Sequence, residues 1–82
     1  MLRWEEQKSG GWYAYSGDLI VGMVVQISVG ESKGLWTYDL SAVHWKWTCK
    51  GHGDVKTAHY ARQSLARAWE QWCIRASLQP KI

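Results

Sequence analysis

Residues 57–77 constrain the fold most, because their apolar side chains recur with the period of an α-helix. At about 100° per residue, the apolar side chains of this stretch fall within about 60° of one direction: Ala58, Ala61, Leu65, Ala68, Trp69, Trp72 and Ala76. Thr57 can cap the first turn, and Pro80 prevents continuation. We therefore predict one amphipathic helix over residues 58–77, with a face suited to a flat partner.

The residues before this helix favour short β-strands separated by turns. The predicted strands cover residues 2–7, 12–15, 19–29, 35–40 and 43–50. In residues 19–29 we expect the core face to carry the odd-numbered side chains: Leu19, Val21, Met23, Val25, Ile27 and Val29. In residues 43–50 the alternation is clearest, and we expect Trp45 and Trp47 to face the helix. The glycines of residues 51–54 are expected to end that strand.

Short connections between consecutive strands favour antiparallel neighbours. We therefore predict an α+β fold in a single domain, residues 1–82, with a four- to five-stranded antiparallel β-meander and one C-terminal helix packed on one face. A chain of 82 residues is near the lower size at which a single core suffices. Its seven Trp and four Tyr compensate, because each aromatic side chain can bury about 150–250 Å².

Hydropathy predicts no membrane partner. The longest apolar run, residues 19–29, is well short of the roughly 20 residues that a membrane helix needs. No basic region followed by an apolar stretch is visible at the N-terminus, so we expect a cytoplasmic location.

The residue types that zinc selects occur at four positions, Cys49, His52, His59 and Cys73. Within the predicted helix, Cys73 lies about 20 Å from His59, too far for one ion to bridge. A Cys49–Cys73 disulfide is geometrically allowed, but a cytoplasmic setting disfavours it. We therefore predict no metal and no cofactor.

Catalytic motifs are missing from the sequence. It contains no glycine-rich phosphate cradle after a strand, no serine nucleophile elbow and no helical His pair with a Glu between. We therefore predict no catalytic residues and a protein that is not an enzyme.

Two surfaces are candidates for binding. The outer side of the helix carries Tyr60, Arg67 and Ile74, and Tyr and Arg are favoured anchors in protein interfaces. Together with the lysines of the last predicted strand, the predicted partner-binding residues are Tyr60, Arg67, Ile74, Lys46 and Lys50. The partner is expected to be a protein or a protein–nucleic acid complex.

The alternative function is nucleic-acid binding. Residues 1–41 carry three basic and five acidic side chains, whereas residues 42–82 carry seven and two. Such a basic half permits a nucleic-acid partner. The sheet face away from the helix is expected to combine lysines with Thr37, Tyr13 and Tyr15. Cations interleaved with aromatic rings on a sheet are typical of surfaces that bind single-stranded nucleic acid. The residues of this alternative are His44, Lys46, Lys50, Arg62 and Arg67.

Tryptophan is in surplus for so small a core. We expect Trp4 or Trp36 at the margin of the core, where such a side chain can form a homodimer contact or pair at a sheet edge.

The order of these features resembles that of short uncharacterised proteins of phages, prophages and proteobacteria. The matching residues are Leu2, Trp4, Gly10, Gly11, Trp12, Trp36, Trp45, Trp47, Gly51, Thr57, Ala61, Leu65 and Ala68. The resemblance implies a β-meander followed by a helix and a mobile-element origin, with the host cytoplasm as the location. Because small phage proteins of this kind include inhibitors of host defence, the expected function is non-enzymatic docking on a macromolecular partner, as in an anti-CRISPR protein.

Overall fold

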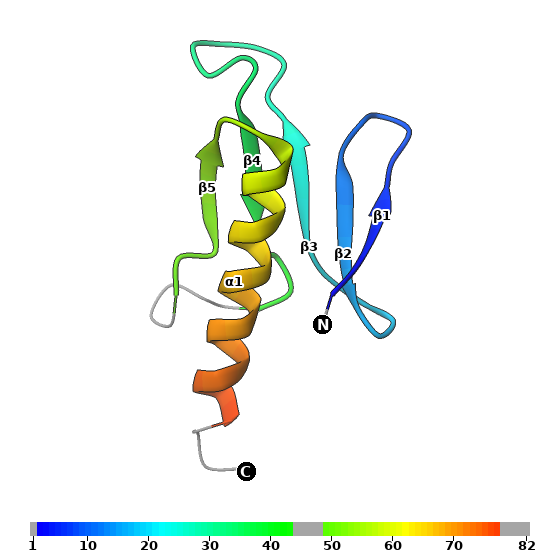
Figure 1. Ribbon diagram of the computed structural model, residues 1–82, viewed down its shortest axis with the longest axis vertical. Helices are drawn as coiled ribbons and strands as arrows, with labels where there is room; N and C mark the ends of the chain where they lie inside the picture. Colours follow the sequence, from blue (N-terminus) through cyan, green and yellow to red (C-terminus); the bar gives the residue numbers. More distant parts are fainter. Residues whose placement is uncertain (1, 44–48, 78–82) are drawn as a thin grey trace.

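The computed structural model describes residues 2–43 and 49–77. Along the chain these residues form β1 (Arg3–Glu6), β2 (Trp12–Ser16), β3 (Leu19–Gln26), β4 (Trp36–Asp39), β5 (His52–Val55) and α1 (Ala58–Ser77). The described strands pair antiparallel in the order β1-β2-β3-β4-β5, and α1 lies on one face of the sheet and runs roughly along β4 and β5 (Figure 1). The predicted α+β fold, an antiparallel sheet followed by a C-terminal helix, is therefore confirmed over these residues.

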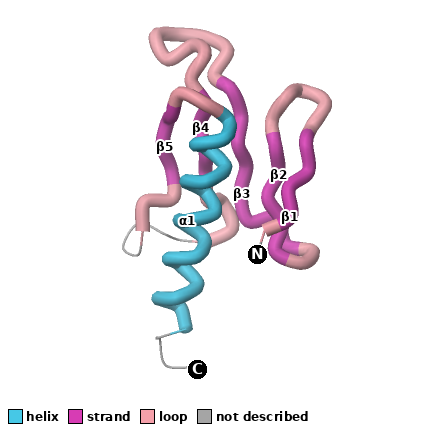
Figure 2. The backbone as a smooth tube through the Cα atoms, in the orientation of Figure 1, coloured by secondary structure: helices cyan, strands magenta, loops and turns pink. Residues whose placement is uncertain are grey.

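Helix α1 covers only part of the sheet. It packs against β3, β4 and β5, while β1 and β2 lie to its side (Figure 2). Three side chains of the predicted apolar stripe, Ala61, Leu65 and Ala68, are buried in the core. The first turn is capped as the sequence predicts, because the backbone N–H of Tyr60 donates to Thr57 Oγ1 at 3.1 Å.

The predicted core face of β3 is wrong for most of its length. Val24 is fully buried under α1, whereas Met23 and Val25 lie on the opposite face and Val29 is 76% exposed. The cause is a β-bulge, because Ala14 pairs with Gly22 and the next residue of β2, Tyr15, pairs with Ile20. Val21 is the extra residue of this bulge and is also fully buried, so the alternation changes phase within the strand.

The last described strand lies outside the range predicted for the last strand. Residues 44–48, which carry most of the predicted strand 43–50 and both Trp45 and Trp47, lie outside the described residues. The segment 51–54, where we expected the strand to end, instead contributes to β5, whose residues His52–Val55 pair with β4. Gly53 suits this strand because a Cβ there would lie 3.0 Å from the Tyr38 hydroxyl oxygen, so the missing side chain makes room for the Tyr38 ring.

Candidate binding surfaces

The outer helix face, defined here by Tyr60, Arg67 and Ile74, lies on the side of α1 away from the sheet. Tyr60 is 58% exposed and Ile74 is 54% exposed, and Arg67 is exposed between them. The three residues are seven positions apart, which is close to two helical turns, so they form one stripe along the helix. The structure therefore brings these predicted residues together on one accessible surface.

The second candidate surface is a group of exposed cations at the β5 side of α1. Lys50, Arg67 and Arg75 are all exposed, and we call them the cationic flank. Burial raises the pKa of the Cys49 thiol, and the nearby charge of Arg75 acts in the opposite direction. The charge of Arg75 therefore acts on Cys49, whose next residue along the chain is Lys50.

Arg67 belongs to the same flank. Burial raises the pKa of the Tyr38 hydroxyl, while a hydrogen bond with Ser64 and the charge of Arg67 act to lower it. The charge of Arg67, which is a residue of the outer helix face, therefore acts on the Tyr38 hydroxyl. Of the other residues predicted for binding, Lys50 is exposed, whereas Lys46 and His44 lie outside the described residues.

Arg62 lies between α1 and the first two strands instead of on the cationic flank. Its guanidinium carbon is 4.8 Å from the centroid of the Trp12 ring and 6.0 Å from that of Trp4. Its Nε atom is buried and has no hydrogen-bond partner among the described residues. This residue of the nucleic-acid alternative is therefore engaged in a cation–π contact within the chain.

The tryptophans that we expected at the margin also pack against the core. Trp4 and Trp36 are partly buried there, and the ring centroids of Trp36 and Trp12 are 5.7 Å apart. Further along α1, the rings of Trp69 and Trp72 stack with their centroids 5.6 Å apart. Trp69 lines a surface hollow of about 490 Å³ that Leu2, Ala66, Glu70 and Cys73 complete.

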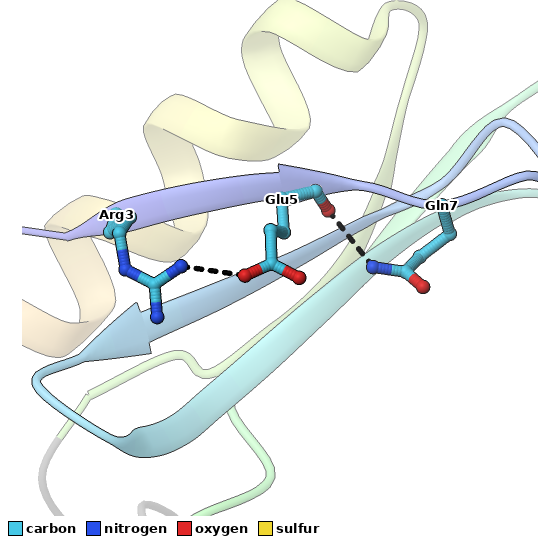
Figure 3. Close-up of polar contacts among 3 residues, drawn as sticks. All are labelled: Arg3, Glu5 and Gln7. Carbon is cyan, nitrogen blue, oxygen red and sulfur yellow. Dashed lines mark hydrogen bonds and ion pairs between the residues drawn. The ribbon is translucent and has the colours of Figure 1, made fainter.

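The open face is the side of the sheet that faces away from α1. The strand register places the following residues on it: Arg3, Glu5, Tyr13, Tyr15, Met23, Val25, Thr37, Asp39, His52 and Asp54. Arg3, Glu5 and Gln7 extend from the same side of β1, and Arg3 Nη1 lies 2.6 Å from Glu5 Oε2 (Figure 3). The Arg3 guanidinium also lies 4.4 Å from the centroid of the Tyr15 ring.

The composition of the open face differs from the predicted basic surface. Tyr13, Tyr15 and Thr37 lie there as expected, but the described residues add the carboxylates of Asp39 and Asp54. Met23 and Val25 were missed because uninterrupted alternation along residues 19–29 places them with Val21 on the core side, whereas the bulge moves them to this side. Gly22 was an available signal, since a glycine within an apolar strand indicates a bulge or a close approach of another element.

The cysteines and histidines considered for metal binding are dispersed. Cys49 and Cys73 are both free thiols. Over residues 2–43 and 49–77, no three His, Cys, Asp or Glu side chains gather closely enough to hold a metal ion. The described helix is also not apolar enough to cross a membrane.

Comparison with known proteins identifies no relative of this chain. No protein-family model, curated protein or solved structure matches the chain.

Proposed function

We propose that this chain is a non-enzymatic binding protein that docks on a macromolecular partner through the outer helix face. The observation that carries the proposal is the exposed stripe of Tyr60, Arg67 and Ile74 on a helix whose other side is anchored in the core. Tyr and Arg are enriched among the residues that dominate binding energy in interfaces. A helix held by buried Leu65 presents them with little loss of conformational entropy on binding.

The chemistry of the surface favours a partner with an acidic region. The cationic flank of Lys50, Arg67 and Arg75 borders the outer helix face, so both would meet the same partner surface. Complementary charge of this kind speeds association and fixes orientation. A protein or a protein–nucleic acid complex would suit it. The resemblance to short phage-type proteins adds a candidate class, the complexes of bacterial defence, which an anti-CRISPR-like inhibitor would occupy.

The proposal is tested by phage plating. The chain is expressed in a panel of bacterial strains, each carrying one active CRISPR system and challenged with a phage that the system targets. We expect plating to recover in at least one strain, and Arg67→Glu to abolish the recovery, because it reverses the charge at the centre of the docking stripe.

Lys33→Glu is the matched control. It makes the same change of charge on an exposed residue of the β3–β4 loop, at the end of the molecule opposite to the C-terminal end of α1 (Figure 1). Recovery should persist in this variant. Equal recovery with Arg67→Glu would remove the outer helix face from the proposal, and failure in every strain would refute the inhibitor class.

Nucleic-acid binding is the second candidate, and the cationic flank is the observation that favours it. Phosphate contacts by Lys and Arg release counterions, so affinity should fall steeply with salt. Oligonucleotide titration followed by tryptophan fluorescence would measure this, with Lys50→Ala and Arg67→Ala each lowering the salt slope by about 1. Lys33→Ala should leave the slope unchanged, and an absence of binding at low salt would exclude this candidate.

A further inference from the structure

The open face has an apolar centre although no described element covers it. Tyr13, Met23 and Val25 lie together on β2 and β3, and they line one hollow of about 440 Å³. Ile20, which pairs with Tyr15 at the other end of this face, is 41% exposed. An antiparallel sheet that packs one face on a helix usually turns polar residues to water on the other. The apolar centre of the open face therefore marks it as an interaction surface.

The two edges of the open face carry different charged side chains. The β1 edge carries the cations Arg3 and Lys8 with one carboxylate, Glu5, which is paired with Arg3 within the chain, so Lys8 gives this edge its net positive charge. The opposite edge carries the carboxylates of Asp39 on β4 and Asp54 on β5, and His52 Nδ1 lies 3.9 Å from Asp39 Oδ1. The face therefore has a basic edge and an acidic edge on either side of its apolar centre.

We propose that the open face is the interface of a symmetric homodimer, in which the two sheets pack face to face and β1 of each copy lies over β5 of its partner. A two-fold axis that runs along β3 produces this arrangement, because it exchanges the two edges of the sheet. The apolar centre of each copy then covers that of its partner at the usual spacing of packed sheets, about 10 Å. The occupant of the open face is thus a second copy of this chain.

The strand register shows which residues would meet. Glu5, Tyr13, Met23, Asp39 and His52 form one row across the described sheet, because each is paired with the next. With the axis along β3, Met23 faces its own counterpart, Glu5 faces His52, and Tyr13 faces Asp39.

The neighbouring row adds a charge pair. Val25 pairs with Thr37, and Thr37 pairs with Asp54, so Asp54 ends this row at the β5 edge. Gln7, whose N–H donates to the Gly11 carbonyl at 2.7 Å, continues the β1 edge, and Lys8 follows it. Lys8 of each copy therefore approaches Asp54 of its partner.

The charges also disfavour a face-to-face arrangement in which the axis crosses the strands at the row of Met23. Such an axis would place β1 over β1 and β5 over β5, which brings Glu5 onto Glu5 and Asp39 onto Asp39. Like charges placed opposite one another across an interface are unfavourable. The arrangement with exchanged edges avoids both of these contacts.

Such a dimer would be bivalent. Each copy buries the side of its sheet opposite to α1, so the two outer helix faces point away from each other. The dimer could hold two partner molecules or two sites of one large partner, which raises the effective affinity without a new contact. The interface does not involve Tyr60, Arg67 or Ile74, so it can be tested independently of the proposed function.

Sedimentation velocity of the full chain over a range of concentrations provides the first test. We expect a concentration-dependent dimer, and we expect Met23→Glu to raise its dissociation constant by more than about tenfold, since two carboxylates would meet at the axis. Met23 is outside the core, so the variant should fold, and circular dichroism checks this. The matched control is Tyr60→Glu, which places the same charge on the outer helix face and should leave the dimer unchanged.

A charge exchange tests the arrangement. Lys8→Glu and Asp54→Lys should each weaken the dimer by about threefold to tenfold, and the double variant should restore it. The two residues are at opposite edges of the described sheet, about 19 Å apart at 4.8 Å per strand, so a restored affinity can only arise between copies. A chain that stays monomeric at millimolar concentration, a dimer insensitive to Met23→Glu, or a double variant as weak as the single variants would overturn the proposal.

Discussion

Tyr38 connects the sheet to the helix through its hydroxyl group. The side chain is 6% exposed, and its hydroxyl forms a hydrogen bond with Ser64 on α1. Gly53 on β5 leaves the space that the ring fills. A buried hydroxyl is stable here because its hydrogen bond compensates for the loss of water.

The burial of Tyr38 predicts a loss of stability at alkaline pH. Burial raises the pKa of its hydroxyl above the ordinary value of 10.0, so the folded state keeps the proton when the unfolded chain loses it. The contribution of Tyr38 to the free energy of unfolding should therefore be constant below pH 10.0 and fall as pH rises from there through the folded pKa. Urea unfolding over this range would measure the decline, with Cys49→Ser as the background because burial also raises the pKa of that thiol. Adding Tyr38→Phe to the Cys49→Ser background should flatten the decline. An unchanged slope would contradict the assignment of this decline to Tyr38.

At the scale of elements, the contact of α1 with β3 depends on Gly22. A Cβ at Gly22 would lie 2.3 Å from the Asp39 carbonyl oxygen and 3.0 Å from Leu65 Cδ1. Leu65 itself is fully buried. The missing side chain therefore lets the helix approach the sheet, and the small Ala61 and Ala68 on the same stripe allow the same close packing.

We predict that Gly22→Ala destabilises the fold more than Gly53→Ala. The new methyl group at position 22 meets a backbone oxygen that cannot move without disturbing β4, so we expect a cost of about 3 kcal/mol. At position 53 it meets the Tyr38 ring at 3.0 to 3.2 Å, and a small shift of the ring should limit the cost to about 1 kcal/mol. Urea denaturation would compare the variants, and equal losses would show that the helix does not depend on Gly22.

At the scale of the whole molecule, the β1–β2 hairpin is held to the helix by side chains. The backbone of α1 packs on β3, β4 and β5, but Arg62 reaches the Trp12 and Trp4 rings on the other side. Trp12 in turn contacts Trp36 on β4. These aromatic contacts connect the hairpin to the rest of the core.

We predict that Arg62→Ala loosens the hairpin selectively. Loss of the cation–π contact with Trp12 should cost about 1 to 2 kcal/mol, and amide hydrogen exchange in β1 should speed up by about tenfold. The matched control is Arg75→Ala, which removes an exposed Arg from the same helix and should leave β1 unchanged. Equal acceleration in β1 and β5 would indicate a general loss of stability instead.

Local patterns in the sequence were sufficient for the helix and for the type of fold. The 3.6-residue period marked Ala61 and Leu65 as core residues, because helical spacing is set within the segment itself. Turn residues and short connections likewise indicated the antiparallel meander. Of the candidate binding residues, Tyr60, Arg67 and Ile74 followed from the same period, since the outer face of a helix is determined once its buried face is known.

The tertiary structure decided which face of β3 is buried and where the last strand lies. A strand alternates between its two faces, so one bulge at Val21 was enough to exchange Met23 and Val25 with Val24. Pairing with β4 made a strand of His52–Val55 despite its glycine, because the Tyr38 ring fills the space that the glycine leaves. The acidic edge of the open face follows from the same pairing. Such features depend on contacts between distant segments, which no local pattern contains.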